Sequence, residues 1–152
     1  IEANGNKIID LKIPGCRPRF SPDGKQIAWG SSDNEISAGP IDTDSDDPKM
    51  GAWRVHIKDD KNKIYHSRWS PDGQYLGFSR GPDGEGDVTK PGTFQAACEI
   101  MGVYAPGWNI GVVPSQQEGI IDLEQTTNAD FAMLTTNGCS DKESAWFLPR
   151  KK

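Results

Sequence analysis

Alternating carboxylates are the feature of this sequence that could most readily do chemistry. Asp42, Asp44 and Asp46 occupy every second position of the segment DTDSDD. Side chains spaced in this way can converge on one hard cation, and Ca²⁺ takes carboxylate oxygens as ligands. The segment departs from an EF-hand loop, because Asp47 stands where that loop has glycine and Trp53 where it has glutamate. Two interpretations stay open: a solvated acidic loop, or a weak calcium site at Asp42, Asp44 and Asp46.

The other titratable residues do not form a catalytic constellation. Asp23 and Asp72 recur because they belong to a repeated Ser-Pro-Asp-Gly turn, so we expect a structural role for both. His56 and His66 fall in consecutive expected strands without cysteine or carboxylate at metal spacing, which favours ordinary strand residues. The chain also lacks a G-x-S-x-G elbow and a glycine-rich phosphate loop that opens a helix. We therefore expect a protein that is not an enzyme, with calcium as the only cofactor that the sequence suggests.

Composition and charge narrow the class of protein. The 152 residues suit one domain, and 34% hydrophobic residues make a lean core for that length. A formal net charge of -5 without a basic stripe argues against a nucleic-acid partner. No apolar run approaches the ~20 residues that cross a bilayer, so no transmembrane segment is expected. The 17 Gly and 11 Pro imply many turns and favour an all-β fold.

The cysteines bear on the disulfide state of the chain, and the first residue bears on its processing. Cys16, Cys98 and Cys139 are three in number, so at least one thiol has no disulfide partner within the chain. Their spacing matches no zinc or haem motif. Small buried or partly buried thiols, or one disulfide in an oxidising compartment, both stay open. The chain starts at Ile1 without methionine, which suggests processing or excision from a longer protein.

One segment of the sequence is written twice. RFSPDGKQIAWGS at residues 19–31 recurs as RWSPDGQYLGFSR at residues 68–80, without a gap. In the shared Ser-Pro-Asp-Gly core, proline fixes φ, aspartate bonds its own backbone, and glycine takes a positive φ. Large apolar residues then alternate at period two, which predicts a half-buried strand. Each copy is expected to be strand, tight turn, strand, and a degraded third copy contains SAWFLP at residues 144–149.

Further strands are expected around these copies. Residues 53–58 and 108–113 both begin with tryptophan and alternate, and short apolar stretches lie at residues 7–13, 63–65 and 131–135. With about four strands to a unit, the single domain divides into blade-like units at residues 7–58, 63–113 and 129–149, the last of them partial. Residues 33–52, 81–107 and 115–130 are expected to be long loops that cluster on one face, often the binding face of a repeat protein.

The aromatic residues divide into three groups. Those at equivalent repeat positions are expected in the core: Phe20, Trp29, Trp69, Phe78 and Trp146. Trp53 and Trp108 open matching strands and are expected to pack between units. Phe94 and Tyr104 lie in a long excursion and have no repeat equivalent. They are candidates for an interaction surface, because interfaces are enriched in aromatic side chains.

The repeated core F/W-S-P-D-G-x-x-I/L-x-F/W, followed by a Trp-led strand, resembles the blade repeat of TolB-type β-propellers. The likeness is specific in the two Ser-Pro-Asp-Gly cores and extends in fragments from residue 7 to residue 149. It implies an all-β, propeller-like fold of four-stranded blades. Members of that family are mostly binding and scaffolding modules. The resemblance therefore also implies a protein partner and an exported, periplasmic or other extracytoplasmic bacterial location.

The number of expected blades is too small for a ring. About three four-stranded blades are expected, whereas a closed propeller has roughly four to eight. Repeat units bury their apolar faces against neighbours, so an open stack leaves faces and edges exposed. Copies of the chain could complete a ring together, a partner could cover the open ends, or the chain could be a piece of a longer protein.

These observations predict a non-enzymatic protein-binding or assembly subunit. It would associate with a partner protein, or with itself, through open blade faces. Two alternatives stay open. One is a propeller module that binds a small ligand, a sugar or calcium, and the other is a fragment of a longer enzyme-bearing polypeptide.

Overall fold

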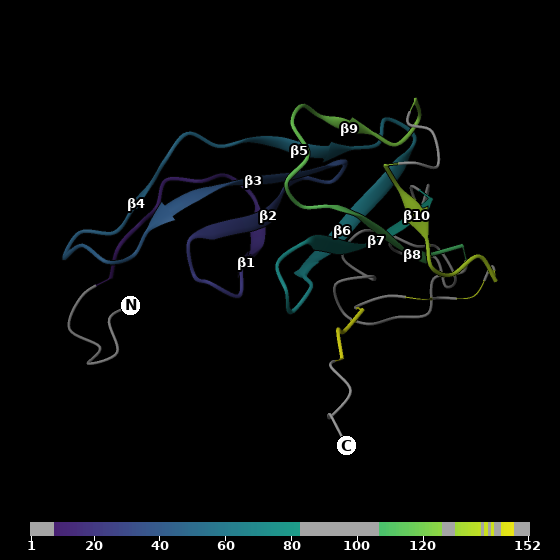
Figure 1. The fold of residues 1–152 in the computed structure, drawn as a ribbon. Coiled ribbons are helices and arrows are strands. Elements are labelled where there is room, and N and C mark those ends of the chain that lie inside the picture. The colour runs from purple at the N-terminus through teal and green to yellow at the C-terminus, as the bar shows by residue number, and fades with distance from the viewer. Residues whose placement is uncertain are drawn as a thin grey trace, which may run out of the picture.

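A computed structural model describes residues 8–82, 107–125, 130–137, 139, 141 and 144–147 of the chain. All regular elements in these residues are strands, which confirms the all-β prediction. The ten strands are β1 (Cys16–Phe20), β2 (Gln26–Ser32), β3 (Glu35–Asp42), β4 (Lys49–Met50), β5 (Arg54–Lys58), β6 (Asn62–Trp69), β7 (Tyr75–Pro82), β8 (Asn109–Pro114), β9 (Ile121–Asp122) and β10 (Ala132–Met133). They form two sheets, shown side by side in Figure 1.

Each sheet contains an antiparallel meander in chain order. The first sheet runs β1-β2-β3-β5-β9, with β4 paired to β3, and β9 lies parallel to β5. The second sheet runs β6-β7-β8-β10 with antiparallel pairs throughout. Neither sheet closes on itself in the part of the chain that the structure describes. The repeated sequence segments form β1-turn-β2 in the first sheet and β6-turn-β7 in the second, as predicted.

The two Ser-Pro-Asp-Gly turns have the same hydrogen bonds. In the first turn, the Ser21 hydroxyl donates to Asp23 Oδ1 at 2.5 Å, and Gly24 has a φ of 73°. In the second, the Ser70 hydroxyl donates to Asp72 Oδ1 at 2.5 Å, and Gly73 has a φ of 72°. The serine hydrogen bond is the main cause that lowers the pKa of Asp23 and of Asp72. Both aspartates therefore hold a turn together, which agrees with the structural role predicted for them.

The main core lies between the two sheets. Side chains of the first sheet and the second sheet meet in one buried cluster: Ala28, Ile36, Ala38, Ile57, Ile64, Trp69, Leu76, Phe78, Val113, Ile121 and Leu123. The short strand β9 adds Ile121 to this cluster while its backbone pairs with β5. Burial of such apolar surface is the largest favourable contribution to folding, so each sheet stabilises the other.

A smaller cluster lies on the outer face of the first sheet. Ile27, Trp29 and Ile41 are buried there, and Leu11, Ile13 and Met50 pack against them. Ile27 and Trp29 flank Ala28 on β2 and therefore point away from the second sheet, because side chains alternate along a strand. Residues 8–14 thus cover part of this face with their side chains.

The strand expected at residues 7–13 is wrong for its described part, because residues 8–13 have no regular structure. Asp10 Oδ1 accepts the Lys12 backbone N–H at 2.9 Å, and Lys12 has a φ of 57°. A side chain that bonds a backbone amide two residues on stabilises a turn in competition with a strand. The apolar alternation therefore predicted that Leu11 and Ile13 pack against a core, but it did not predict their backbone conformation.

The expected long loop at residues 33–52 instead contains the central strand β3. β3 pairs with β2 on one side and with β5 on the other. The β2–β3 turn at Asp33 and Asn34 joins the strands tightly, since Ser32 pairs with Glu35. The sequence signal was missed because Ser37, Gly39 and Pro40 interrupt the apolar alternation that identifies most strands.

Two strand equivalences also differ from the prediction. The Trp-led strands at residues 53–58 and 108–113 do not correspond, because β5 follows β3 in its sheet whereas β8 directly neighbours β7. The stretch at residues 131–135, expected to begin a third unit, supplies β10 to the edge of the second sheet. The described residues therefore form two sheets where about three units were expected.

The aromatic core is confirmed in part. Trp29, Trp69 and Phe78 are buried as predicted. Phe20 and Trp146 are not, with exposed fractions of 54% and 37%. Both lie on outer faces of the two-sheet stack, where no sheet in the described residues covers them. Trp108 and Trp53 were both expected to pack between units, and their environments differ. Trp108 is buried and stacks on Tyr65, whereas Trp53 is 41% exposed and meets Trp29 edge-on.

A buried aspartate joins the two sheets at the β5–β6 turn. Asp59 is fully buried, and its carboxylate accepts hydrogen bonds from the Asn62 backbone N–H at 2.8 Å and from Arg80 Nε at 2.5 Å. The Asn34 side chain donates to the backbone carbonyl of Asp59 at 3.0 Å. Burial by itself would raise the pKa of Asp59, but the hydrogen bonds from Arg80, Asn62 and Lys61 outweigh it and lower that pKa.

Replacing Asp59 should destabilise the fold. Asp59→Asn is expected to lower the free energy of unfolding by about 3 kcal/mol, because Arg80 would keep its burial and lose its main partner. Because the folded pKa of Asp59 lies below the unfolded value of about 3.9, its contribution is complete at neutral pH. The contribution is lost as pH falls through the folded pKa, so the variant should also lose part of the acid sensitivity of stability.

Urea denaturation between neutral pH and pH 3 measures both effects. Asp60→Asn is the matched control, because Asp60 is the next residue and pairs with Lys58 at the exposed surface. That change should cost less than about 1 kcal/mol. Equal losses for Asp59→Asn and Asp60→Asn would show that the Asp59–Arg80 pair does not hold the sheets together.

Candidate interaction site

The contact between the two sheets includes one side-chain hydrogen bond with a repeated counterpart. Trp69 at the end of β6 is buried against the first sheet, and its indole Nε1–H donates to the Arg19 carbonyl of β1 at 3.0 Å. Trp69 belongs to the RWSPDG copy and Arg19 to the RFSPDG copy. The tryptophan of one copy therefore bonds the backbone just before the aromatic residue of the preceding copy.

The degraded third copy makes the same bond one step further on. Trp146 Nε1–H donates to the Arg68 carbonyl at 3.1 Å. Arg68 precedes Trp69 as Arg19 precedes Phe20. Residues 144–147, which we name the strap, thus lie on the second sheet in the way that the second sheet lies on the first. The strap has no strand pairing within the described residues.

Gly77 gives the strap its place on the second sheet. A Cβ atom at Gly77 would lie 3.3 Å from Ser144 Oγ and 3.4 Å from Trp146 Nε1. Gly77 lies between Leu76 and Phe78, which face the core, so it faces the opposite side of β7. The same repeat position in the first sheet is Ala28, whose side chain faces the second sheet. The strand after each Ser-Pro-Asp-Gly turn, β2 or β7, therefore has a small residue at the position where the next tryptophan packs.

At the other end of the stack, the equivalent aromatic residue has no such neighbour. Phe20 corresponds to Trp69 and Trp146 in the repeat, and 54% of its surface is exposed. It lies in a groove on the outer face of the first sheet, which we name the Phe20 groove. The groove is lined by Ile9, Leu11, Phe20, Ile41, Thr43, Ser45, Asp46 and Pro48. An apolar floor with a polar rim is the usual composition of a protein-binding patch.

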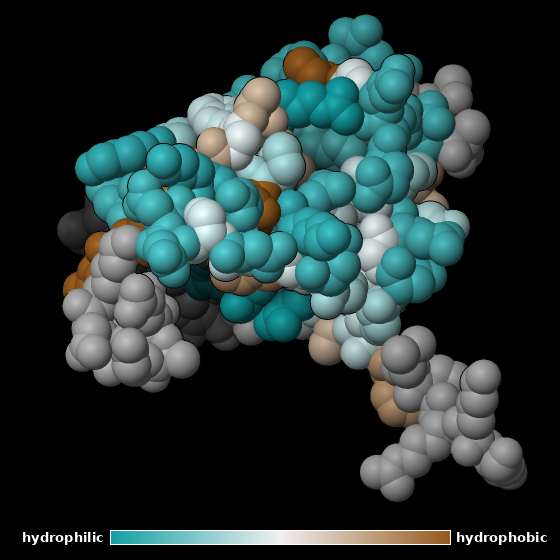
Figure 2. Space-filling view, turned by 60° about the vertical axis from the view of Figure 1, so that its left-hand side comes forward, coloured by the Kyte–Doolittle hydropathy of each residue, from teal (hydrophilic) through white to brown (hydrophobic). Residues whose placement is uncertain are grey.

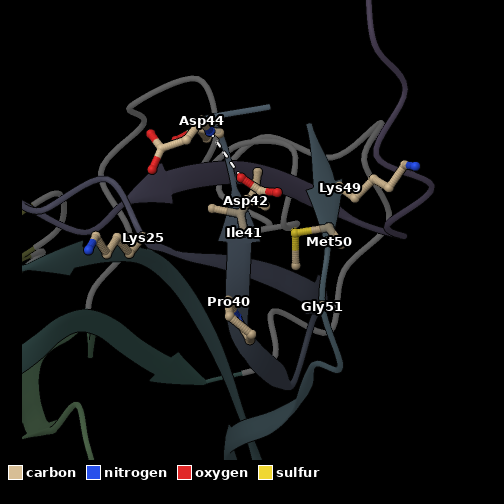
Figure 3. Close-up of a pocket in the computed structure, with 9 residues that line it drawn as sticks. Lys25, Pro40, Ile41, Asp42, Asp44, Lys49, Met50 and Gly51 are labelled. Atoms are coloured by element: carbon tan, nitrogen blue, oxygen red, sulfur yellow. Dashed lines mark hydrogen bonds between the residues drawn. The ribbon is translucent and has the colours of Figure 1, made fainter. Parts of the chain in front are cut away.

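The predicted acidic loop forms part of this end of the molecule. Asp42 ends β3, and the exposed residues after it line both the Phe20 groove and a neighbouring pocket with Lys25 and Lys49. In that pocket the Asp44 backbone N–H donates to Asp42 Oδ1 at 3.0 Å, and the two carboxylates point apart (Figure 3). In the part of the chain that the structure describes, no group of three His, Cys, Asp or Glu side chains is placed to hold a metal ion.

The two histidines are buried strand residues. His56 lies on β5, and its Nε2 is 2.9 Å from the Pro114 carbonyl at the end of β8. Burial lowers the pKa of His56, because the charged form loses its water. His66 lies on β6 with a φ of 58°, at a bulge where the pairing with β7 shifts register. His56 therefore bridges the two sheets, which fits the structural role predicted for it.

The predicted interaction residues Phe94 and Tyr104, and Cys98, lie outside the described residues. Cys16 and Cys139 are exposed free thiols, so the burial expected of the cysteines is wrong for these two. Figure 2 shows one face covered mostly by hydrophilic residues, with hydrophobic residues reduced to small separate spots. None of the described segments contains a helix with the length and hydrophobicity to cross a membrane. Sequence reasoning missed the Phe20 groove because it placed Phe20 in the core by analogy with Trp69.

Comparison with known proteins identifies no relative, since no protein-family model, curated protein or solved structure matches the chain.

Calcium titration should give no saturable heat up to millimolar concentration. The described carboxylates of Asp42, Asp44 and Asp46 are exposed and do not form a cluster, and Lys25 and Lys49 add positive charge to the pocket beside them. Isothermal calorimetry measures this, with magnesium as the comparison ion. A saturable calcium heat that disappears in Asp42→Asn and Asp44→Asn would contradict the expectation and support the calcium-site hypothesis.

Proposed function

We propose that this chain is a non-enzymatic protein-binding or assembly subunit built from TolB-like propeller blades. The proposal draws on the repeated Ser-Pro-Asp-Gly hairpins, on two antiparallel meanders in chain order, and on the resemblance of the repeat to such blades. By the same resemblance, we propose an exported, periplasmic or other extracytoplasmic bacterial location. One described pocket contains both His56 and Ser115, but each side chain bonds a backbone carbonyl: His56 Nε2 lies 2.9 Å from the Pro114 carbonyl, and the Ser115 hydroxyl donates to the Gly73 carbonyl at 2.5 Å. These contacts support a structural role for the pair.

The observation that carries the proposal is the contrast between Phe20 and Trp69. The two residues occupy the same repeat position, yet Trp69 is buried by the preceding sheet and Phe20 is more than half exposed. Repeat units are stabilised by their neighbours on both sides, so an exposed position of this kind marks where a further unit or a partner packs. The Phe20 groove is therefore the proposed binding surface, with the acidic loop at its rim.

Replacing Phe20 should abolish association while leaving the fold intact. Phe20→Glu puts a charge into an apolar contact and is expected to weaken association by at least tenfold, as loss of an interface anchor does. Ile120→Glu is the matched control, because Ile120 has the same exposed fraction of 54% and lies away from the groove. Light scattering coupled to size exclusion measures the mass of the purified chain and of the complex isolated from its source.

The proposal requires a native mass above the 16.6 kDa of one chain. Phe20→Glu should return that mass to a single chain, and Ile120→Glu should behave as the wild type. A wild-type protein that is well folded, monomeric and without a partner in both preparations would refute the proposed function.

A further inference from the structure

Each outer face of the stack carries one half of the contact that joins the two sheets: the exposed aromatic residue Phe20 on the first sheet, and Gly77 on the second. Within the chain, the face of the second sheet that carries Trp69 packs on the Ala28 face of the first. Continued by one step, the same arrangement would place the Phe20 face of a second copy on the Gly77 face of this copy. Gly77 leaves more room than Ala28 does, because it has no side chain at the position that receives the aromatic residue.

The strap already occupies that place. Trp146 bonds the Arg68 carbonyl, as Trp69 bonds that of Arg19, and lies over Gly77 with Ser144. We propose that the Gly77 face is a docking surface for the Phe20 face of a second copy of this chain, and that the strap competes for it. This inference rests on the proposed assembly function and names both the partner and the surface it uses.

The strap is held weakly enough to be displaced. Trp146 keeps 37% of its surface exposed and Phe147 keeps 80%, whereas Trp69 is almost fully buried at the equivalent contact. The indole bond to Arg68 anchors the strap, and the nearest backbone hydrogen bond along the chain joins the Asp141 N–H to the Trp108 carbonyl at 3.0 Å. A second copy would replace this anchor with a whole sheet face.

Head-to-tail contact of this kind has a structural consequence. The two surfaces belong to opposite ends of one chain, so the interface is heterologous. Such interfaces form rings when the rotation closes and filaments when it does not. A ring of several copies would supply the neighbours that two sheets alone cannot provide.

The test removes the competitor and measures association. Trp146→Ala should raise the apparent affinity between copies about tenfold, because it frees the docking surface from a competing contact. Phe147→Ala is the matched control, since Phe147 is the adjacent aromatic residue and is largely exposed. Sedimentation velocity over a concentration series gives the affinity for each variant, and circular dichroism checks that each remains folded.

Two further variants make the outcome specific. The double variant Trp146→Ala/Phe20→Glu should be monomeric, because it lacks the aromatic side chain that would pack on the Gly77 face of a second copy. In the Trp146→Ala background, Gly77→Val should prevent the increase in association, because its side chain fills the acceptor position. As a single variant, Gly77→Val should displace the strap, and tryptophan fluorescence should report that Trp146 has moved to water.

Unchanged association in a folded Trp146→Ala variant would overturn the inference and assign the strap as a permanent cap. The proposed function would survive that result if Phe20→Glu still reduced the native mass. Conversely, association that appears only in Trp146→Ala and vanishes with Phe20→Glu would support the docking surface even if the wild type is monomeric and without a partner.

Discussion

The indole of Trp69 and the carbonyl of Arg19 make the contact on which the arrangement of the two sheets depends. The bond ties the end of β6 to β1, and the large indole ring fills the core between the sheets at the same time. An apolar core alone does not fix how one sheet lies on another, because the hydrophobic effect has no direction. A hydrogen bond from a buried ring to one backbone carbonyl does, since a buried donor without its acceptor is costly.

The strand β6 is fixed at both ends by polar contacts. At its start, the Asn62 backbone binds the buried carboxylate of Asp59, which also holds Arg80 of β7. At its end, Trp69 binds the first sheet. The apolar residues between these two points pack in the shared core. One strand thus sets the distance and direction between the sheets, and the Trp146–Arg68 bond repeats half of this arrangement without a sheet behind it.

Much of the local structure could be predicted from the sequence, and most of the site could not. The Ser-Pro-Asp-Gly turns and the strands after them were predictable, because proline, aspartate and glycine specify a turn with little help from the rest of the chain. β3 was not, because its apolar pattern is interrupted and its place is set by pairing on both sides. The exposure of Phe20 was not predictable either, since the repeat records which residue packs on a neighbour but not whether a neighbour is present. The Asp59 network was equally hidden, because Asp59 and Arg80 are far apart in the sequence.

The central claim is that the strap lies on the second sheet through the same bond that holds the two sheets together. Exchange of the indole N–H protons, followed by ¹⁵N-edited NMR in deuterated water, tests this directly. The account predicts that the Trp69 indole proton exchanges only on unfolding, and that the Trp146 proton exchanges measurably more slowly than that of Trp53. Trp53 is 41% exposed and makes no indole hydrogen bond within the described residues, so it is the internal reference. A Trp146 proton that exchanges as fast as that of Trp53 would contradict the account.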